Sequence, residues 1–250
     1  SPLCLNCHAP QQNSSLSDAS QVNHQLLEGV SCESCHGNAE EWVILHRRSG
    51  WQAKKKELGP DKMYEMYGFR DTKNPWTRAQ VCATCHVGSA GGKDVNHDLY
   101  AAGHPRLYFE LSAFNANLPA HWDRNKDRQR ENTNAGPEIQ SSFEAKLWAV
   151  GQVAGVEAAV DLAVYRANRS KSAFTIGEHY PAGATIPAWP EFAESGCFAC
   201  HHELKAPSWR QSRGYSNRAP GGFPWQSWLT PFVDDALKIS TVNQAPSVTN

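Results

Sequence analysis

The chain has 250 residues, with 24 basic and 25 acidic side chains, a formal net charge of −1 and a mean hydropathy of −0.58. This balance gives no case for a nucleic acid or an anionic membrane as the partner, and no apolar run is expected to reach the length of a membrane span. A hydrophobic fraction of 40% is lean for a core of this size, so we expect another source of apolar surface.

The predicted elements are mainly helical. The first helix covers about residues 39–48, and a second begins at Pro105, because proline suits the first helical position and apolar residues follow it. Residues 123–136 and 213–224 are rich in polar, Gly or Pro residues and predict exposed or irregular segments. Strand patterns are weak throughout, so the predicted fold is mainly α with long loops.

The clearest helix is predicted over residues 141–168. Ser141 and Glu144 can form a capping box at its start, and apolar residues then recur with helical spacing. Gly151 and Gly155 lie four residues apart and permit a close approach, either by another helix, which is the general use of a helical glycine, or by a cofactor.

All eight cysteines fall into four Cys-x-x-Cys pairs, and a histidine follows each pair directly. The four motifs are Cys4-Cys7-His8, Cys32-Cys35-His36, Cys82-Cys85-His86 and Cys197-Cys200-His201. Two thiols at this spacing can bond the vinyl carbons of one heme, and the next residue then lies beneath the iron. Zinc ribbons and disulfides also use paired cysteines, but neither requires the four histidines.

The motifs therefore predict four covalently attached, closely packed c hemes with His8, His36, His86 and His201 as proximal ligands. Thioether attachment takes place outside the cytoplasm, so we expect a bacterial protein of the periplasm or the extracellular space. We also expect Ser1-Pro2 to be the start of a processed or trimmed chain.

Seven further histidines compete for the four distal positions. Methionine is a poor source, since the chain has only Met63 and Met66, both in a Tyr-rich segment that predicts a loop or packing. Bis-histidine ligation is therefore expected, and without methionine ligands the heme potentials should be low. The expected distal ligands are His104, His46, His97, His24 and His202, while His121 and His179 rank last.

Two segments resemble a known family. Residues 29–37, Gly-Val-Ser-Cys-Glu-Ser-Cys-His-Gly, and His46-Arg47-Arg48 after them are similar to the tetraheme electron-carrier cytochromes of ammonia-oxidising bacteria. That group is related to hydroxylamine oxidoreductase and the pentaheme nitrite reductase. The resemblance covers mainly residues 1–90 and implies stacked heme pairs on a helical scaffold. Residues 94–105 and 197–204 are similar to segments of larger multiheme cytochromes of the same group.

The resemblance also bears on His46 and on the heme at His8. In the family, the histidine matching His46 serves a heme whose motif lies upstream of the one matching Cys4-Cys7-His8, and this chain has no such motif. Either His46 serves another heme, or an N-terminal segment is missing, or the heme belongs to a neighbouring subunit. The heme that matches the one at His8 lacks a distal side chain in the family, which makes His8 the first candidate for an open iron.

The expected function is electron transfer between redox protein partners by a single tetraheme domain. Within residues 1–250, three motifs occupy 1–90, a helical segment at 91–196 supplies distal ligands, and 197–250 holds the fourth motif and a tail. Two alternatives are kept. One is a reductase or oxidase of a small nitrogen compound at a five-coordinate heme, and the other is a subunit of a conducting filament or larger complex, which the aromatic residues at 223–232 would support.

Overall fold

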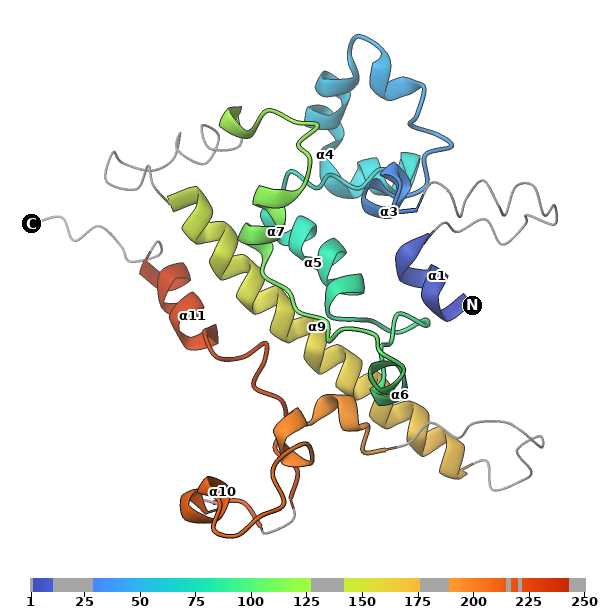
Figure 1. Ribbon diagram of the computed structural model, residues 1–250. Coiled ribbons are helices and arrows are strands. Elements are labelled where there is room, and N and C mark those ends of the chain that lie inside the picture. The colour runs from blue at the N-terminus through green and yellow to red at the C-terminus, as the bar shows by residue number, and fades with distance from the viewer. Residues whose placement is uncertain are drawn as a thin grey trace, which may run out of the picture.

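The computed structural model describes residues 2–10, 29–126, 142–175, 189–214, 217–219 and 222–242. These residues form helices, turns and two isolated β-bridges, and no strand occurs among them (Figure 1). The prediction of a mainly helical fold is confirmed for the part of the chain that is described.

The elements follow one another along the chain with long connections. They are α1 (Pro2–His8), α3 (Cys32–His36), a 3-10 turn (Leu45–Arg47), α4 (Trp51–Tyr67), α5 (Pro75–His86), α6 (His97–Ala101), α7 (Leu111–Asn117), α9 (Ser142–Thr175), two further 3-10 turns (Phe192–Glu194 and Cys197–Ala199), α10 (Trp209–Arg213) and α11 (Val233–Val242).

The long helix α9 runs through the middle of the molecule and contacts α5, α7 and α11 (Figure 1). Its predicted existence is confirmed, although it continues to Thr175, and the proposed cap at Ser141 lies outside the described residues. A Cβ atom at Gly151 would lie 2.6 Å from the Cβ atom of Leu111, and one at Gly155 would lie 3.5 Å from the ring of Phe109. The absence of a side chain at both glycines therefore leaves room for the segment that enters α7.

The Phe143–Arg169 stretch of α9 is long and apolar enough to cross a membrane by length and composition alone, which corrects the expectation that no apolar run reaches that length. The buried side chains of Phe143, Leu147 and Ala154 belong to the main core cluster. That cluster also holds the buried alanines of α5 and the residues entering α7. These contacts are those of a central core helix.

A second core cluster lies under α4 and contains Trp42, Trp51, Met63 and Phe69. The predicted helix at 39–48 is wrong, because this stretch forms turns and only the short 3-10 segment Leu45–Arg47. Helix α4 was not predicted, since Gly59-Pro60 interrupts its pattern, and Gly59 has a positive φ of 74° at a kink. Met63 therefore lies in a helix as a packing residue, not in a loop.

The helix predicted from Pro105 begins six residues later, at Leu111. The carboxylate of Glu110 accepts hydrogen bonds from the backbone N–H groups of Ser112 (3.0 Å) and Ala113 (2.6 Å), so Glu110 is the N-cap. Residues 105–110 are non-helical, which lets Phe109 and Leu111 reach the glycine positions of α9.

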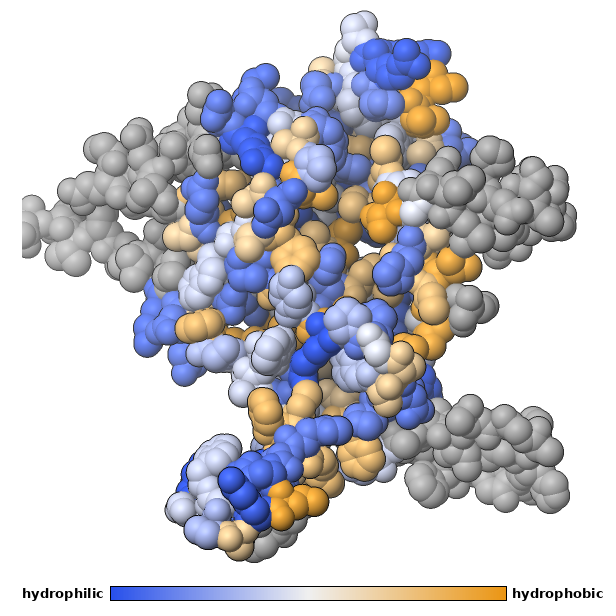
Figure 2. Space-filling view, viewed as in Figure 1, coloured by the Kyte–Doolittle hydropathy of each residue, from blue (hydrophilic) through white to orange (hydrophobic). Residues whose placement is uncertain are grey.

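Few large side chains are fully buried among the described residues: these are Met63, Leu111 and Leu147. Many large apolar side chains are exposed instead and lie among polar groups on the surface (Figure 2). Side chains alone thus leave much apolar surface uncovered, as the composition predicted.

Candidate heme-attachment sites

The first motif lies on α1, with Cys4 and His8 exposed and Cys7 half-buried. The side-chain amide of Asn6, between the two cysteines, donates a hydrogen bond of 3.1 Å to the carbonyl oxygen of Gly92. This bond ties α1 to the loop after α5, with Cys4 and the His8 imidazole exposed.

The second motif forms α3. The Nδ1 atom of His36 lies 3.1 Å from the carbonyl oxygen of Arg70, and the backbone N–H of Arg70 donates to the carbonyl oxygen of His36 at 2.8 Å. The imidazole also stacks on Phe69, with ring centres 5.6 Å apart. Burial lowers the pKa of His36, which favours the neutral ring.

The third motif, Cys82-Cys85-His86, ends α5. Asn74 caps this helix by accepting hydrogen bonds from two backbone N–H groups, and Pro75 occupies its first turn. The buried alanines of α5 belong to the core cluster shared with α9, and Cys82 packs against that cluster, while Cys85 is half-buried and His86 is exposed. The packing of α5 on α9 therefore positions this motif.

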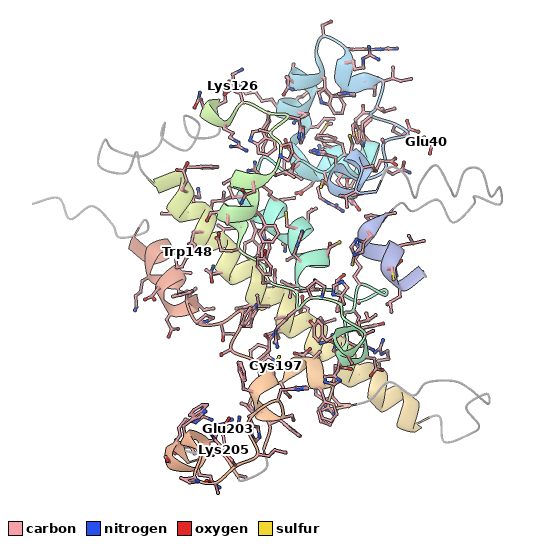
Figure 3. All side chains as sticks on the ribbon, viewed as in Figure 1. Glu40, Lys126, Trp148, Cys197, Glu203 and Lys205 are labelled. Carbon is pink, nitrogen blue, oxygen red and sulfur yellow. The ribbon has the colours of Figure 1, made fainter. Side chains whose placement is uncertain are left out.

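The fourth motif lies in the 3-10 turn Cys197–Ala199 and the residues after it (Figure 3). The backbone N–H of His201 donates to the carbonyl oxygen of Cys197 at 2.8 Å, which sets the motif in a tight turn. The guanidinium of Arg106 contacts the Cys197 sulfur at 2.6 Å, and Arg210 donates to the carbonyl oxygen of Phe198.

All eight cysteines are free, so the paired spacing is not used for disulfides. Among the described residues, no group of three or more His, Cys, Asp or Glu side chains is arranged to hold a metal ion, as a zinc ribbon would require. Both alternatives to heme attachment thus lack the geometry they need in this part of the chain.

Three motif histidines each face a second histidine. The ring centres lie 6.4 Å apart for His8 and His104, 6.1 Å for His36 and His121, and 6.3 Å for His97 and His201. Two imidazoles bound to opposite sides of one metal at about 2.0–2.1 Å have ring centres about 6.3 Å apart. All three pairs therefore have the ring separation that two imidazoles bound to one iron would have.

The Nδ1 atoms support this arrangement. The Nδ1 atom of His104 lies 2.7 Å from the carbonyl oxygen of Pro105. The Nδ1 atom of His36 likewise lies beside the carbonyl oxygen of Arg70. A ring that donates from Nδ1 to a carbonyl group presents an unprotonated Nε2 atom to a metal. Both histidines thus have the Nδ1 contact that an iron-ligating imidazole would use.

The other expected ligands are placed differently. His46 lies against Trp42, at 5.7 Å between ring centres, and not against a motif histidine. His202 has its Nδ1 atom 2.8 Å from the carbonyl oxygen of Glu203 and faces no motif ring among the described residues. His24 and His179 lie outside the described residues. His121 ranks low among the candidate ligands because its sequence context is loop-like. Nothing in its local sequence indicates its position opposite His36.

His97, an expected distal ligand, is positioned by Glu191, which is 9% exposed. The Glu191 Oε1 atom accepts hydrogen bonds from the backbone N–H groups of His97 (2.9 Å) and Ala193 (3.0 Å). One carboxylate thus joins the start of α6 to the segment that leads into the fourth motif. This role was not predicted from the sequence.

A buried charge cluster, Arg166 with Asp94 and Glu194, reinforces the same junction. Arg166 on α9 is 4% exposed; its Nε atom donates to Asp94 at 3.0 Å and its Nη1 atom to Glu194 at 2.5 Å. Burial disfavours the charge of Arg166, but the hydrogen bonds and charges of the two carboxylates outweigh it and raise its pKa. Asp94 precedes His97, and Glu194 precedes Cys197, so α9 holds both sides of this site.

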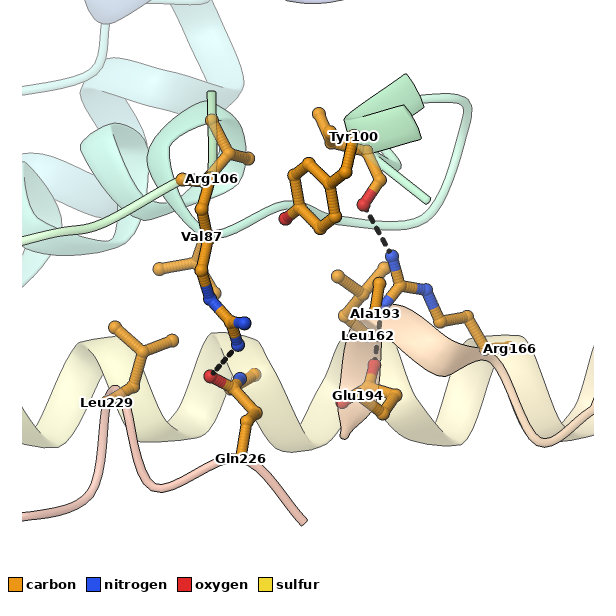
Figure 4. A pocket seen from close by; sticks show the side chains of 12 residues that line it. Val87, Tyr100, Arg106, Leu162, Arg166, Ala193, Glu194, Gln226 and Leu229 are labelled. Carbon is orange, nitrogen blue, oxygen red and sulfur yellow. Dashed lines mark hydrogen bonds and ion pairs between the residues drawn. The ribbon is translucent and has the colours of Figure 1, made fainter. Parts of the chain in front are cut away.

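A cavity of about 30 Å³ lies beside this cluster, between Tyr100, Arg106, Arg166 and Glu194 (Figure 4). The volume is that of about one or two water molecules and far below that of a porphyrin. The cavity therefore belongs to the junction between sites and is not itself a heme pocket.

Three motifs lie close together around the C-terminal part of α5. The neighbouring thiol of Cys85 is the main reason that the pKa of Cys7 is raised, with burial adding to it. Burial, followed by the charge of Cys35, raises the pKa of Cys82 to about 11. The third motif thus lies between the first and the second.

Residues 1–37 match the family model described as "Cytochrome c554 and c-prime". The matched segment contains the first two motifs, with His8 and His36. No curated protein and no solved structure matches the chain. At the level of the family, the match supports a c-type multiheme cytochrome that binds heme c covalently and transfers electrons.

Proposed function

We propose that the chain is a tetraheme electron carrier in which pairs of histidines ligate at least three of the hemes. The observation that carries the proposal is the spacing of three motif histidines from His104, His121 and His97. A heme held in this way supplies reversible one-electron chemistry at its iron.

The residues of the chain set the ligation and the environment of each iron. His8 and His104, His36 and His121, and His201 and His97 are the proposed ligand pairs. Met63 is 1% exposed in the core under α4, so it packs among aromatic rings instead of serving an iron. With histidine ligands the potentials should be low, because a methionine ligand is what raises a heme potential.

The four motifs form an open line in the proposed carrier. His97 and His104 lie seven residues apart on one short segment, so the fourth site adjoins the first. Contact between Cys7 and Cys85 joins the first site to the third, and the charge interaction of Cys35 with Cys82 joins the third to the second. Electrons would pass along the order fourth, first, third, second, or in reverse.

Location and partners follow from the chemistry of heme attachment. We place the carrier in the periplasm or the extracellular space of a bacterium, with redox proteins as donor and acceptor. The reduction potentials of the hemes and the direction of electron flow are measured in the holoprotein.

A second candidate function attaches to the third motif. Among the described residues, the His86 ring contacts Phe109 and Phe114 but no second histidine. His8, the first candidate for an open iron from the resemblance, has His104 opposite it instead. Catalysis on a small nitrogen compound would therefore be sought at His86.

The test is low-temperature electron paramagnetic resonance of the oxidised holoprotein, after its heme content has been measured by mass spectrometry. We expect four hemes per chain, with at least three low-spin hemes that do not react with nitric oxide or cyanide. Fewer hemes, or two or more high-spin irons, would contradict the carrier. A single heme that binds the added ligand would support the second candidate, and four inert hemes would remove it.

A further inference from the structure

The fourth motif lies in a lobe that projects from the rest of the molecule. We define the C-terminal heme lobe as the described residues of 197–218, which include the motif and α10. It forms the lower end of the molecule in Figures 1 and 2, away from α4 and α5. Cys197, Cys200 and His201 are all exposed there. A heme attached at this position lies at the end of the proposed line.

Charge distinguishes this lobe from the rest of the chain. It carries four basic side chains, Lys205, Arg210, Arg213 and Arg218, and one acidic side chain, Glu203, for a formal charge of +3. The whole chain has a charge of −1, so the remainder carries −4. The lobe thus has a net positive charge, whereas the remainder of the chain has a net negative charge.

Apolar side chains lie among these basic groups. Phe198 is 75% exposed, Leu204 is 93% exposed and Trp209 is 56% exposed. A bound heme would cover part of this surface, and the rest would surround the site. An apolar centre with a charged rim is typical of a protein–protein interface, and its charge selects a partner of opposite sign.

Arg210 has a structural role, since its guanidinium donates to the carbonyl oxygens of Phe198 and Ala199 in the motif. Arg213 stacks over the ring of Trp209 at 4.8 Å. Neither Lys205 nor Arg218 forms an ion pair within the described part of the chain. Both residues are exposed on the lobe.

We propose that the C-terminal heme lobe is the docking surface for an acidic redox protein, which exchanges electrons with the chain at the fourth motif. This inference rests on the proposed carrier function and adds the chemistry of its partner. The basic rim attracts the acidic surface, and the apolar residues then hold the two redox centres close together.

The experiment uses the holoprotein and a plant-type ferredoxin as the acidic one-electron probe. Stopped-flow absorbance measures the rate at which reduced ferredoxin reduces the hemes, and calorimetry measures the Kd of the two oxidised proteins. The lobe variant is Lys205→Glu, Arg213→Glu, Arg218→Glu, which keeps Arg210. The matched control is Arg47→Glu, Arg48→Glu, Lys56→Glu, with the same charge change on exposed residues near α4.

We expect the lobe variant to lose at least about tenfold in both association rate and affinity at low ionic strength, and the control to lose less than about twofold. The wild-type rate should fall with added salt, and the variant rate should not. If the triple variant loses heme, the variant Lys205→Gln, Arg218→Gln replaces it, with a smaller loss in the same direction.

Equal rates for the lobe variant and the wild type, or a larger loss in the control, would overturn the docking surface. The docking surface would also be overturned if the lobe bound phosphatidylserine vesicles while its charges had no effect on the ferredoxin reaction. Heme content and reduction by dithionite are measured first: a chain that lacks the hemes refutes the carrier itself, whereas a fully loaded and reducible chain without lobe dependence refutes only the docking surface.

Discussion

At the scale of single residues, the histidines considered as distal ligands show that closeness in sequence to a motif differs from closeness in space. His46 follows a motif closely in the sequence, yet its ring lies against Trp42. His121 lies 85 residues after His36 in the chain, and the two rings lie 6.1 Å apart. A distal ligand is chosen by position in space, because the iron requires only a ring on its open side.

If His36 and His121 ligate one iron, as proposed, His121→Ala should convert that heme from low-spin to high-spin, because its iron would lose the second imidazole. The change is measured by electron paramagnetic resonance of the oxidised protein. His46→Ala is the control, since this exposed ring contacts no motif histidine among the described residues, and its spectrum should match the wild type. If His46→Ala produced a high-spin heme and His121→Ala did not, His46 would be the ligand instead.

At the scale of elements, α9 holds the fourth site in place through charge as well as packing. Arg166 is the link, because Asp94 leads to α6 and Glu194 leads to the fourth motif. Arg169, one turn further on, reaches the second oxygen of Asp94 at 3.3 Å but is 38% exposed. The two arginines share a partner and differ in burial.

Removing Arg166 should therefore lower the free energy of unfolding far more than removing Arg169. We expect Arg166→Ala to lower the free energy of unfolding by about 3–5 kcal/mol, because it leaves the buried carboxylate of Glu194 without a cation and that of Asp94 with only the partly exposed Arg169. Arg169→Ala should cost less than about 1 kcal/mol, since water screens its ion pair. Chemical denaturation of both holoproteins measures the difference, and equal losses would show that the buried cluster does not stabilise the junction.

The contact between α4 and the segment before α5 gives stability that depends on pH. Burial raises the pKa of Asp71, but the hydrogen bond and charge of Lys55, at 2.9 Å, and the Lys73 backbone N–H outweigh it and hold the pKa below its ordinary value. A depressed carboxyl pKa adds stability above the unfolded value of about 3.9, which is lost as the pH falls through the folded pKa.

Asp71→Asn should thus lower the free energy of unfolding by about 1 kcal/mol at neutral pH, with partial solvent screening included. The two proteins should become equally stable in acid, once Asp71 is protonated in both the folded and the unfolded state. Denaturation at a series of pH values checks this. A difference that stays constant from neutral to acid would mean that the carboxylate charge is not its cause.

At the scale of the whole molecule, the side chains form two separate small cores with much apolar surface between and around them. One core joins α5, α7 and α9, and the other lies under α4. The motif side chains are exposed or half-buried on the surfaces of these cores. Four porphyrins would cover such surfaces and join the two cores.

Expression without heme attachment should consequently give a largely unfolded chain. Far-ultraviolet circular dichroism should show a loss of most helix content relative to the holoprotein, because the apolar area that hemes would bury stays in water. Replacement of all eight cysteines by serine provides a second route to the same state. Native helix content in either preparation would show that the two cores fold without the hemes.

The sequence by itself determined the four Cys-x-x-Cys-His motifs, the helical class and the central helix, because spacing within a few residues and helical periodicity are local properties. It did not determine the start of α7, which depends on the cap at Glu110 and on glycine positions in α9. Nor did it indicate the pairing of His36 with His121 or the buried Arg166 cluster. These contacts join residues far apart in the chain, and only the packing of α3, α5, α6 and α9 brings them together.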